Sequence, residues 1–282
     1  MEILRTISAM SRWREGLYRQ VQIVGFVPTM GFLHRGHLAL MEEALHRADQ
    51  VIVSIFVNPT QFSPGEDFEH YPRDLDRDIQ LCRDLGVHAV FCPEVEEMYP
   101  PGFQTQVLVA HLTQCLCGQY RPDFFSGVTL VVTKLFCAIR PHLAIFGEKD
   151  FQQLVVVKRL SKDLNLGVQV VPHPTVRERD GLAMSSRNTY LSKEERQSAL
   201  SLYRSLLAAR GMVAQGEHRV DVLLLRVREI IEAEPHTRIQ YVQVVDEDTM
   251  VDIAEVTDKA RMAMAVFVGK ARLIDNMRLR AA

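Results

Sequence analysis

Residues 21–57 read VQIVGFV PTMGFLHRG HLALMEEALHRA DQ VIVSIFV, and this stretch decides the fold. Its first and last pieces are short apolar runs rich in β-branched residues, which is typical of strands buried on both faces of a sheet. The piece between them has apolar residues at helical spacing, namely Leu38, Met41, Leu45 and Ala48. The stretch is therefore predicted to form a β-α-β unit, the building block of a parallel sheet.

The same alternation of strand and helix continues through the first half of the chain. Further helices are predicted at 76–85, 127–139 and 151–164, and each leads into a short apolar run, VHAVF, HLAIF or VQVV. Strands that alternate with helices form a parallel sheet with helices on its faces. We expect an α/β fold in which residues 1–175 form a Rossmann-like, doubly wound domain that binds nucleotide and acid.

The pattern changes at Pro172-His173-Pro174. After a loop, Ser192 and Glu195 form the capping-box signature of a helix start. Two predicted helices and three apolar runs follow: 193–214, 220–233, IQYVQVV, MAMAVFV and ARLIDN. We expect residues 176–282 to form a smaller α/β lid domain with a mostly antiparallel sheet. The alternating MAMAVFV is interpreted as a half-buried strand rather than a cofactor site.

The composition excludes several classes of protein. With 47% hydrophobic and 24% charged residues, the chain has the composition of a globular protein rather than a disordered one. A formal net charge of -2 argues against a nucleic-acid partner, whose binding depends on many phosphate contacts. The sequence contains no uninterrupted apolar run of membrane-spanning length, so we expect no membrane partner and a cytoplasmic location.

The five cysteines indicate neither a disulfide framework nor a structural zinc site, because their number is odd and no pair has C-x-x-C spacing. Cys115 and Cys117 could be interpreted as a redox pair. Their spacing of one residue is uncommon for that chemistry, so buried thiols are the simpler interpretation.

The segment PTMGFLHRGHLAL, residues 28–40, lies where a predicted strand ends and its helix begins. Ligands bind at this edge of open parallel sheets, and the free N–H groups of a helix N-terminus attract phosphate. Gly31 and Gly36 would let the backbone approach a ligand. His34 and His37, three residues apart, can donate hydrogen bonds to one phosphate from the same face of the first helical turn. A metal site is a weaker interpretation, since no neighbouring Cys, Asp or Glu completes a ligand set.

Two amides follow the second predicted strand. Asn58 and Gln61 lie just beyond its end, where neutral amides can hydrogen-bond a hydroxy-acid without adding charge. Asn-Pro is also a good start for a loop, so a surface turn remains an alternative for Asn58.

Two later segments suit phosphate. In GEKD, Gly147 permits a close backbone approach, Lys149 offers a point charge, and Asp150 could position a magnesium ion or the ribose. The alternative is a solvated loop. In the segment 184–187, serine hydroxyls and a guanidinium could grip phosphates, although a flexible interdomain linker would have the same composition.

The motif PTMGFLHRGH resembles the H-x-G-H signature of the nucleotidylyltransferase superfamily, and its long form with PTMG resembles the pantothenate synthetase family. Further segments in the same order are similar to that family: SIFVNPTQF at 54–62, FGEKDFQQL at 146–154, DGLAMSSRNTYLS at 180–192 and GKARLIDN at 269–276. The resemblance thus spans most of the chain.

The resemblance implies a ligase that condenses (R)-pantoate with β-alanine through a pantoyl adenylate and releases AMP and diphosphate. It implies ATP as a substrate, Mg2+ as the metal and a homodimer as the assembly. The implied catalytic residues are His34, His37 and Lys149. The implied ATP contacts are Met30, Gly31, Phe32, Leu33, His34, Arg35, Gly36, His37, Gly147, Glu148, Lys149, Asp150, Val176, Met184, Ser185, Ser186 and Arg187. The implied pantoate contacts are Gln61 and Gln153, with Asn58 beside them.

The metal ligands stay open. Asp74, Asp76 and Asp78 are most simply interpreted as a loose acidic face that solvates a helix start, with Asp78 as a candidate neighbour of magnesium. The chain also departs from the family pattern at 121–128, where RPDFFSGV replaces Gly-His-Phe after Arg-Pro by Asp123, Phe124 and Phe125. A role carried by that histidine is therefore not implied for this chain.

Two alternatives remain at this point. A nucleotidylyltransferase that adenylates a phosphate substrate would need extra basic residues in the substrate pocket, whereas Gln61 and Gln153 are neutral. A non-catalytic nucleotide-binding module would share the fold, because fold alone does not determine function.

Overall fold

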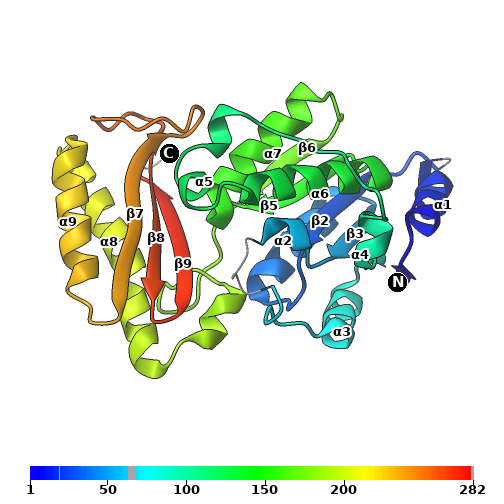
Figure 1. Ribbon diagram of the computed structural model, residues 1–282, viewed down its shortest axis with the longest axis horizontal. Helices are drawn as coiled ribbons and strands as arrows, with labels where there is room; N and C mark the ends of the chain where they lie inside the picture. The colour runs from blue at the N-terminus through cyan, green and yellow to red at the C-terminus, as the bar shows by residue number, and fades with distance from the viewer. Residues whose placement is uncertain (19, 63–67, 281–282) are drawn as a thin grey trace.

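The computed structural model describes residues 1–18, 20–62 and 68–280. These residues form two sheets, each with its own helices (Figure 1). The predicted α/β fold is confirmed: one sheet is parallel and the other is antiparallel.

The parallel sheet has six strands in the order β1-β4-β3-β2-β5-β6. Their bounds are β1 Glu2–Leu4, β2 Val24–Thr29, β3 Gln50–Ile55, β4 Ala89–Phe91, β5 Leu143–Gly147 and β6 Gln169–His173. Because β2 pairs with both β3 and β5, the chain changes direction across the sheet there. Loops that leave the carboxyl ends of such neighbouring strands diverge and leave a crevice for a ligand.

Helices cover both faces of this sheet. One face carries α1 Ile7–Tyr18, α6 Phe124–Ile139 and α7 Phe151–Asp163, and the other carries α2 Arg35–Arg47 and α3 Leu75–Leu85. The strands serve both cores: in β2, Phe26 packs with the first set of helices and Val27 with the second. This two-sided burial explains the continuous apolar runs in the sequence. Two short helices, α4 Val95–Met98 and α5 Cys117–Tyr120, lie in the connection to α6.

The second sheet is a meander of β7 Thr237–Asp246, β8 Ala260–Val268 and β9 Ala271–Arg278. Helices α8 Lys193–Ala214 and α9 Val220–Glu232 pack on one of its faces. The opposite face meets Leu116 and the start of α7. The antiparallel sheet therefore lies against the parallel part of the molecule, which gives a ligand site two different walls.

Several boundaries and one assignment differ from the sequence prediction. The helix expected at 127–139 begins three residues earlier, at Phe124, and the elements β1 and α1 were not predicted. MAMAVFV forms a strand of the core, as predicted, but this strand is not half-buried. It lies in the central strand β8, where alternate residues face α8 and α9 or Leu116 and Tyr241, so both faces are buried.

Candidate active site between the two sheets

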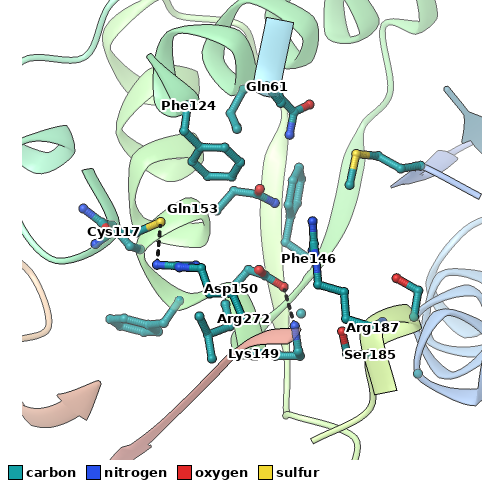
Figure 2. Close-up of a pocket in the computed structure, with 18 of the residues that line it drawn as sticks. Gln61, Cys117, Phe124, Phe146, Lys149, Asp150, Gln153, Ser185, Arg187 and Arg272 are labelled. Atoms are coloured by element: carbon teal, nitrogen blue, oxygen red, sulfur yellow. Dashed lines mark hydrogen bonds and ion pairs between the residues drawn. The ribbon is translucent and has the colours of Figure 1, made fainter. Parts of the chain in front are cut away.

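A cavity of about 1000 Å³ lies between the carboxyl ends of the parallel strands and the antiparallel sheet. Thr29, Ser54 and Gly147 line it from the ends of β2, β3 and β5, and Met264 and Asn276 line it from β8 and β9. Figure 2 shows its polar side chains: Gln61 and Gln153 lie toward one end, and Lys149, Ser185 and Arg187 lie toward the other.

The two histidines form a stacked pair at the start of α2. His34 is the N-cap residue, and its side chain accepts a hydrogen bond from the Gly36 amide (3.1 Å). The His37 Nδ1 atom accepts from the His34 amide (3.3 Å), and the ring centroids are 4.0 Å apart. Because each Nδ1 is an acceptor, each proton is assigned to Nε2. Both rings line the cavity, so each offers one N–H donor.

Both imidazoles are neutral at neutral pH. Burial, with help from the nearby charge of Lys149, lowers the pKa of His34 to about 4. Burial, the neighbouring His34 and Lys149 hold the pKa of His37 well below its usual value. The neutral pair therefore offers hydrogen-bond donors rather than positive charges to the cavity.

Asp78 anchors the loop that precedes this pair. Its carboxylate accepts hydrogen bonds from the amides of Phe32 (2.6 Å) and Leu33 (2.8 Å), and the residue is only 1% exposed. The interpretation of Asp78 as part of a solvated acidic face is thus wrong, because the side chain is buried and both oxygens accept hydrogen bonds from backbone amides. Its place near a magnesium ion stays a prediction. Asp74, in contrast, does cap α3 by accepting from Arg77 N (3.2 Å). Gly31 has a left-handed backbone conformation (φ 85°), and a Cβ atom added to it would lie 3.1 Å from Asp78 Oδ2. A larger residue would therefore be strained at this position.

A second turn follows β5 at Gly147–Asp150. Lys149 and Asp150 both line the cavity, with Lys149 Nζ 3.7 Å from Asp150 Oδ2. Asn276 of β9 donates from Nδ2 to the carbonyl oxygens of Glu148 and Lys149, at 2.9 Å each. This segment is thus held from the antiparallel sheet.

Asn58 lies behind Gln61 rather than in the cavity. It is 1% exposed, and its Nδ2 donates to Gln61 Oε1 (2.9 Å) and to the Gly127 carbonyl (3.1 Å). Its Oδ1 accepts from Tyr99 Oη (2.8 Å). Asn58 does start a 3₁₀ turn, Pro59–Gln61, but not at the surface. With the Gln61 oxygen engaged in this way, its NH₂ group remains the donor for a ligand.

The segment Met184–Arg187 lines the cavity as an ordered turn. Met184 N donates to Val176 O (3.0 Å), and Arg187 N donates to Ser185 Oγ (3.3 Å). The preceding Arg177 makes a bidentate ion pair with Asp275 of β9, at 2.6 and 2.8 Å. The segment therefore forms a defined turn that is joined to Val176 at its start.

Comparison with known proteins decides what kind of site this is. The family model for pantoate-beta-alanine ligase matches residues 2–278. The chain belongs to this family. A pantothenate synthetase from Syntrophobacter fumaroxidans is 51% identical over 282 residues, which are 100% of both chains.

Solved structures of the ligase family have the same fold. Pantothenate synthetase from Thermus thermophilus superposes with a TM-score of 0.94 at 47% identity and 100% coverage of both chains. Pantoate-beta-alanine ligase from Francisella tularensis, complexed with beta-gamma ATP and beta-alanine, gives a TM-score of 0.82 at 33% identity, with 100% of this chain and 99% of that chain covered. The predicted family resemblance is thereby confirmed.

Most of the ligase residues predicted from the sequence lie on the cavity wall. These are Met30, His34, Gly36, His37, Gln61, Gly147, Lys149, Asp150, Gln153, Val176, Met184, Ser185, Ser186 and Arg187. Their contacts with substrates stay predictions.

Six of the predicted residues do not line the cavity: Gly31, Phe32, Leu33, Arg35, Glu148 and Asn58. Leu33 is 1% exposed and belongs to the core under α2. Arg35 is exposed and pairs with Glu42 at 2.6 Å. Glu148 lies 3.5 Å from Arg261. A substrate contact by these six residues would therefore have to come from the backbone or from a rearranged site.

Three cations that line the cavity were not predicted from the sequence: Arg121, Lys270 and Arg272. Arg121 donates to the Gln61 carbonyl (2.9 Å) and stacks on Phe124, 3.9 Å from its ring centroid. Arg272 of β9 donates to Gln240 Oε1 (2.8 Å) and contacts Cys117 Sγ (3.6 Å). The departure at Asp123-Phe124 thus places an aromatic ring under Arg121. Signals were present for all three: Arg121 lies in RPDFFSGV, and Lys270 and Arg272 lie in GKARLIDN, a segment similar to the family.

The described residues offer few ligands for a metal ion. Within residues 1–18, 20–62 and 68–280, no group of three or more His, Cys, Asp or Glu side chains could hold a metal ion. Asp150 offers a single carboxylate at the cavity, where its side chain is 47% exposed. One carboxylate together with nucleotide phosphates suits Mg2+, which keeps several waters and needs few protein ligands.

In the part of the chain described here, no helix combines the length and the apolar character that crossing a membrane requires.

Proposed function

We propose that this ligase condenses (R)-pantoate with β-alanine, using ATP, to give pantothenate, AMP and diphosphate through a pantoyl adenylate. One observation carries the proposal: a single cavity has neutral amides, Gln61 and Gln153, toward one end and groups suited to phosphate, Lys149, Ser185 and Arg187, toward the other. Membership of the pantoate-beta-alanine ligase family and the ATP and beta-alanine complex of the Francisella relative support it.

In the first half-reaction, a carboxylate oxygen of pantoate attacks the α-phosphorus of ATP. The new P–O bond forms as the bond to the bridging oxygen of diphosphate breaks. The Nε2–H groups of His34 and His37 are placed to donate to phosphate oxygens, and Lys149 adds a positive charge. Preorganised donors of this kind stabilise the charge that grows in the transition state without having to reorient.

In the second half-reaction, the β-alanine nitrogen attacks the acyl carbon. The C–N bond forms, the acyl C–O bond breaks, AMP leaves and the nitrogen releases a proton. The cavity's contribution is to hold the adenylate and the amine together away from water, since an exposed adenylate would hydrolyse. We infer that the Ser185–Arg187 segment closes over the phosphates as a lid.

Magnesium fits as a partner of the nucleotide. Asp150 would hold the ion together with the phosphates, and the bound ion would neutralise their negative charge. The chain's own residues then orient the α-phosphate.

The homodimer is implied by the family resemblance alone. We propose a homodimer in the cytoplasm, with residues 1–175 and 176–282 as its two domains. Separate apolar cores around the two sheets support this division. Light scattering of the purified protein tests the dimer.

Exchange of diphosphate into ATP tests the proposed function. The exchange is expected with pantoate and without β-alanine, because adenylation reverses before the amine is needed. A phosphate ester that replaces pantoate in the assay would instead identify a nucleotidylyltransferase. Absence of exchange with every acid and ester, while ATP still binds, would identify a non-catalytic module.

A further inference from the structure

Two consecutive residues of β9 each hold a different wall of the cavity. Asp275 and Asn276 are 3% and 5% exposed. The Asn276 side chain hydrogen-bonds to Glu148 and Lys149, which lie 128 and 127 residues earlier in the chain. The Asp275 carboxylate pairs with Arg177, 98 residues earlier. One dipeptide thus contacts the Lys149 turn directly and is linked to the Ser185–Arg187 segment through Arg177.

The orientation of the Asn276 amide is determined by its neighbours. Its Oδ1 accepts from Arg261 Nη1 (2.6 Å), so its NH₂ group points to the Glu148 and Lys149 carbonyls. Arg261 is itself fixed by Glu247 (2.7 Å) and stacks on Phe151, the first residue of α7, at 3.8 Å from the ring centroid. The turn that carries Lys149 is thereby attached to a buried ionic network of the antiparallel sheet.

Asp275 fixes the other segment through Arg177. Besides its ion pair with Asp275, Arg177 donates to the Gly181 carbonyl (3.1 Å) and stacks on Tyr203. Arg177 forms a β-bridge with Ala183, the residue before Met184. Holding Arg177 therefore holds the base of the segment that ends in Ser185–Arg187.

The Lys149 turn has little local support. Among the described residues, no side chain caps the 3₁₀ turn Glu148–Asp150 or the start of α7. The two amide hydrogen bonds from Asn276 take that role. A displacement of about 1 Å at a catalytic group can reduce a rate by about a hundredfold, so the position of this turn matters to the chemistry.

We propose that Asp275 and Asn276 are positioning residues that set the separation between Lys149 and the Ser185–Arg187 segment, so that both reach one triphosphate. The proposal rests on the proposed function, which assigns both segments to phosphate. It assigns to β9 a part in adenylation that acts through other segments, by way of two backbone carbonyls for Asn276 and the Arg177 side chain for Asp275.

Two variants at Asn276 separate positioning from structural support. Asn276→Asp keeps an acceptor for Arg261 but turns oxygen lone pairs toward two carbonyl oxygens, whereas Asn276→Ala removes every contact. Positioning predicts that both variants lose about tenfold to a hundredfold in kcat for the pantoate-dependent exchange. If Asn276 serves Arg261 alone, Asn276→Asp keeps the wild-type rate and the proposal is overturned.

Thr237 provides a matched control. Its hydroxyl also donates to two carbonyl oxygens, those of Ile231 (2.6 Å) and Glu234 (3.0 Å), but at the end of α9 away from the cavity. Thr237→Val is expected to lower the melting temperature and leave kcat unchanged. A loss of kcat in this variant equal to that of Asn276→Asp would show that general destabilisation explains the effect.

A second readout follows the position of Lys149 directly. The charge of Lys149 helps to keep the pKa of His34 low, so displacement of the turn in Asn276→Ala should raise that pKa in an NMR titration. Thr237→Val should not change it. An unchanged His34 pKa in Asn276→Ala would mean that the turn has not moved, which contradicts the proposal.

Asp275→Asn tests the other half of the dipeptide. It keeps the shape of the side chain, removes its charge and is expected to raise KM for ATP more than it lowers kcat. Lys149→Met, assayed in parallel, separates the proposed phosphate role of Lys149 from the proposed positioning role of Asp275 and Asn276. Full exchange in Lys149→Met removes the proposed phosphate role of Lys149. Loss of exchange in Lys149→Met together with wild-type rates in both Asn276 variants and Asp275→Asn removes the positioning proposal alone.

Discussion

The two turns that face the cavity's phosphate end are supported in different ways. The turn at His34–His37 is held by its own capping box, in which each imidazole accepts a hydrogen bond from a backbone amide. Asp78 from the neighbouring helix holds the loop before it. The turn at Glu148–Asp150 is held by Asn276 from the antiparallel sheet. A locally supported turn is fixed once its strand and helix form, whereas the second takes its position only when the two sheets pack together.

Removing a donor from the first turn should have the largest effect. His37→Ala is expected to fold normally and to lose adenylation by about a hundredfold or more, as when one preorganised donor is removed from an oxyanion site. Initial rates of diphosphate exchange measure the loss. His37→Gln, which keeps an N–H donor, is the matched variant and should recover part of the rate. Unchanged turnover in His37→Ala would remove this residue from the catalytic assignment.

Removing the anchor of the first turn should affect both stability and rate. The Asp78 carboxylate accepts hydrogen bonds from two backbone N–H groups. In Asp78→Asn only one side-chain oxygen remains, so one of these N–H groups faces the NH₂ group of the new side chain. Hydrogen bonds to charged acceptors contribute about 1.5–3 kcal/mol each, and the free energy of unfolding should fall by about that amount. Urea denaturation measures it. Asp76→Asn, on the exposed part of the same helix, is the control and should stay within about 0.5 kcal/mol of wild type.

The difference between the two turns also explains what the sequence could predict. The β-α-β pattern around residues 21–57 specifies neighbouring strands, and the histidines lie within that pattern, so their place at the sheet edge could be predicted. The role of Asp78 could not, because the loop it holds is 45 and 46 residues away and its helical spacing looks like a solvated face. Asn276 lies in an apolar run, and its partners become neighbours only in the folded molecule.

The acid end of the cavity offers a smaller test. Gln61→Leu removes the side-chain amide that faces the cavity and keeps a side chain of similar size. KM for pantoate should rise about tenfold, which corresponds to a loss of about 1.4 kcal/mol of binding free energy. KM for ATP should stay within about twofold. A rise in KM for ATP with no change for pantoate would move Gln61 to the nucleotide end. Steady-state kinetics with each substrate varied in turn gives both constants.

Asn58 provides the comparison for Gln61, because it touches the same side chain from behind. Asn58→Leu leaves Gln61 Oε1 and Tyr99 Oη without their partner. It is expected to lower the free energy of unfolding by about 1–3 kcal/mol, the cost of an unsatisfied buried group, and to raise KM for pantoate less than Gln61→Leu does. A larger rise in KM than in Gln61→Leu would indicate that Asn58 contacts the acid itself.

Acid tests the histidine pair without a mutation. The pKa of folded His34 is about 4, below its ordinary 6.5, so the unfolded chain takes up this proton first as the pH falls. The stability contributed by the neutral ring is thus fully present above pH 6.5 and is lost between 6.5 and 4. His34 and His37 should keep neutral NMR shifts on titration through pH 6.5. A midpoint near 6.5 for either ring would show that the pair is solvated and charged.

The central claim is that this cavity activates a carboxylate at the α-phosphorus of ATP. Pantoate labelled with ¹⁸O in its carboxylate, turned over with ATP and β-alanine, tests it in one mass spectrum. The account predicts that AMP carries one labelled oxygen, because the oxygen that attacks phosphorus leaves with it when the amine attacks the acyl carbon. Label in diphosphate or inorganic phosphate, or none in AMP, would contradict it.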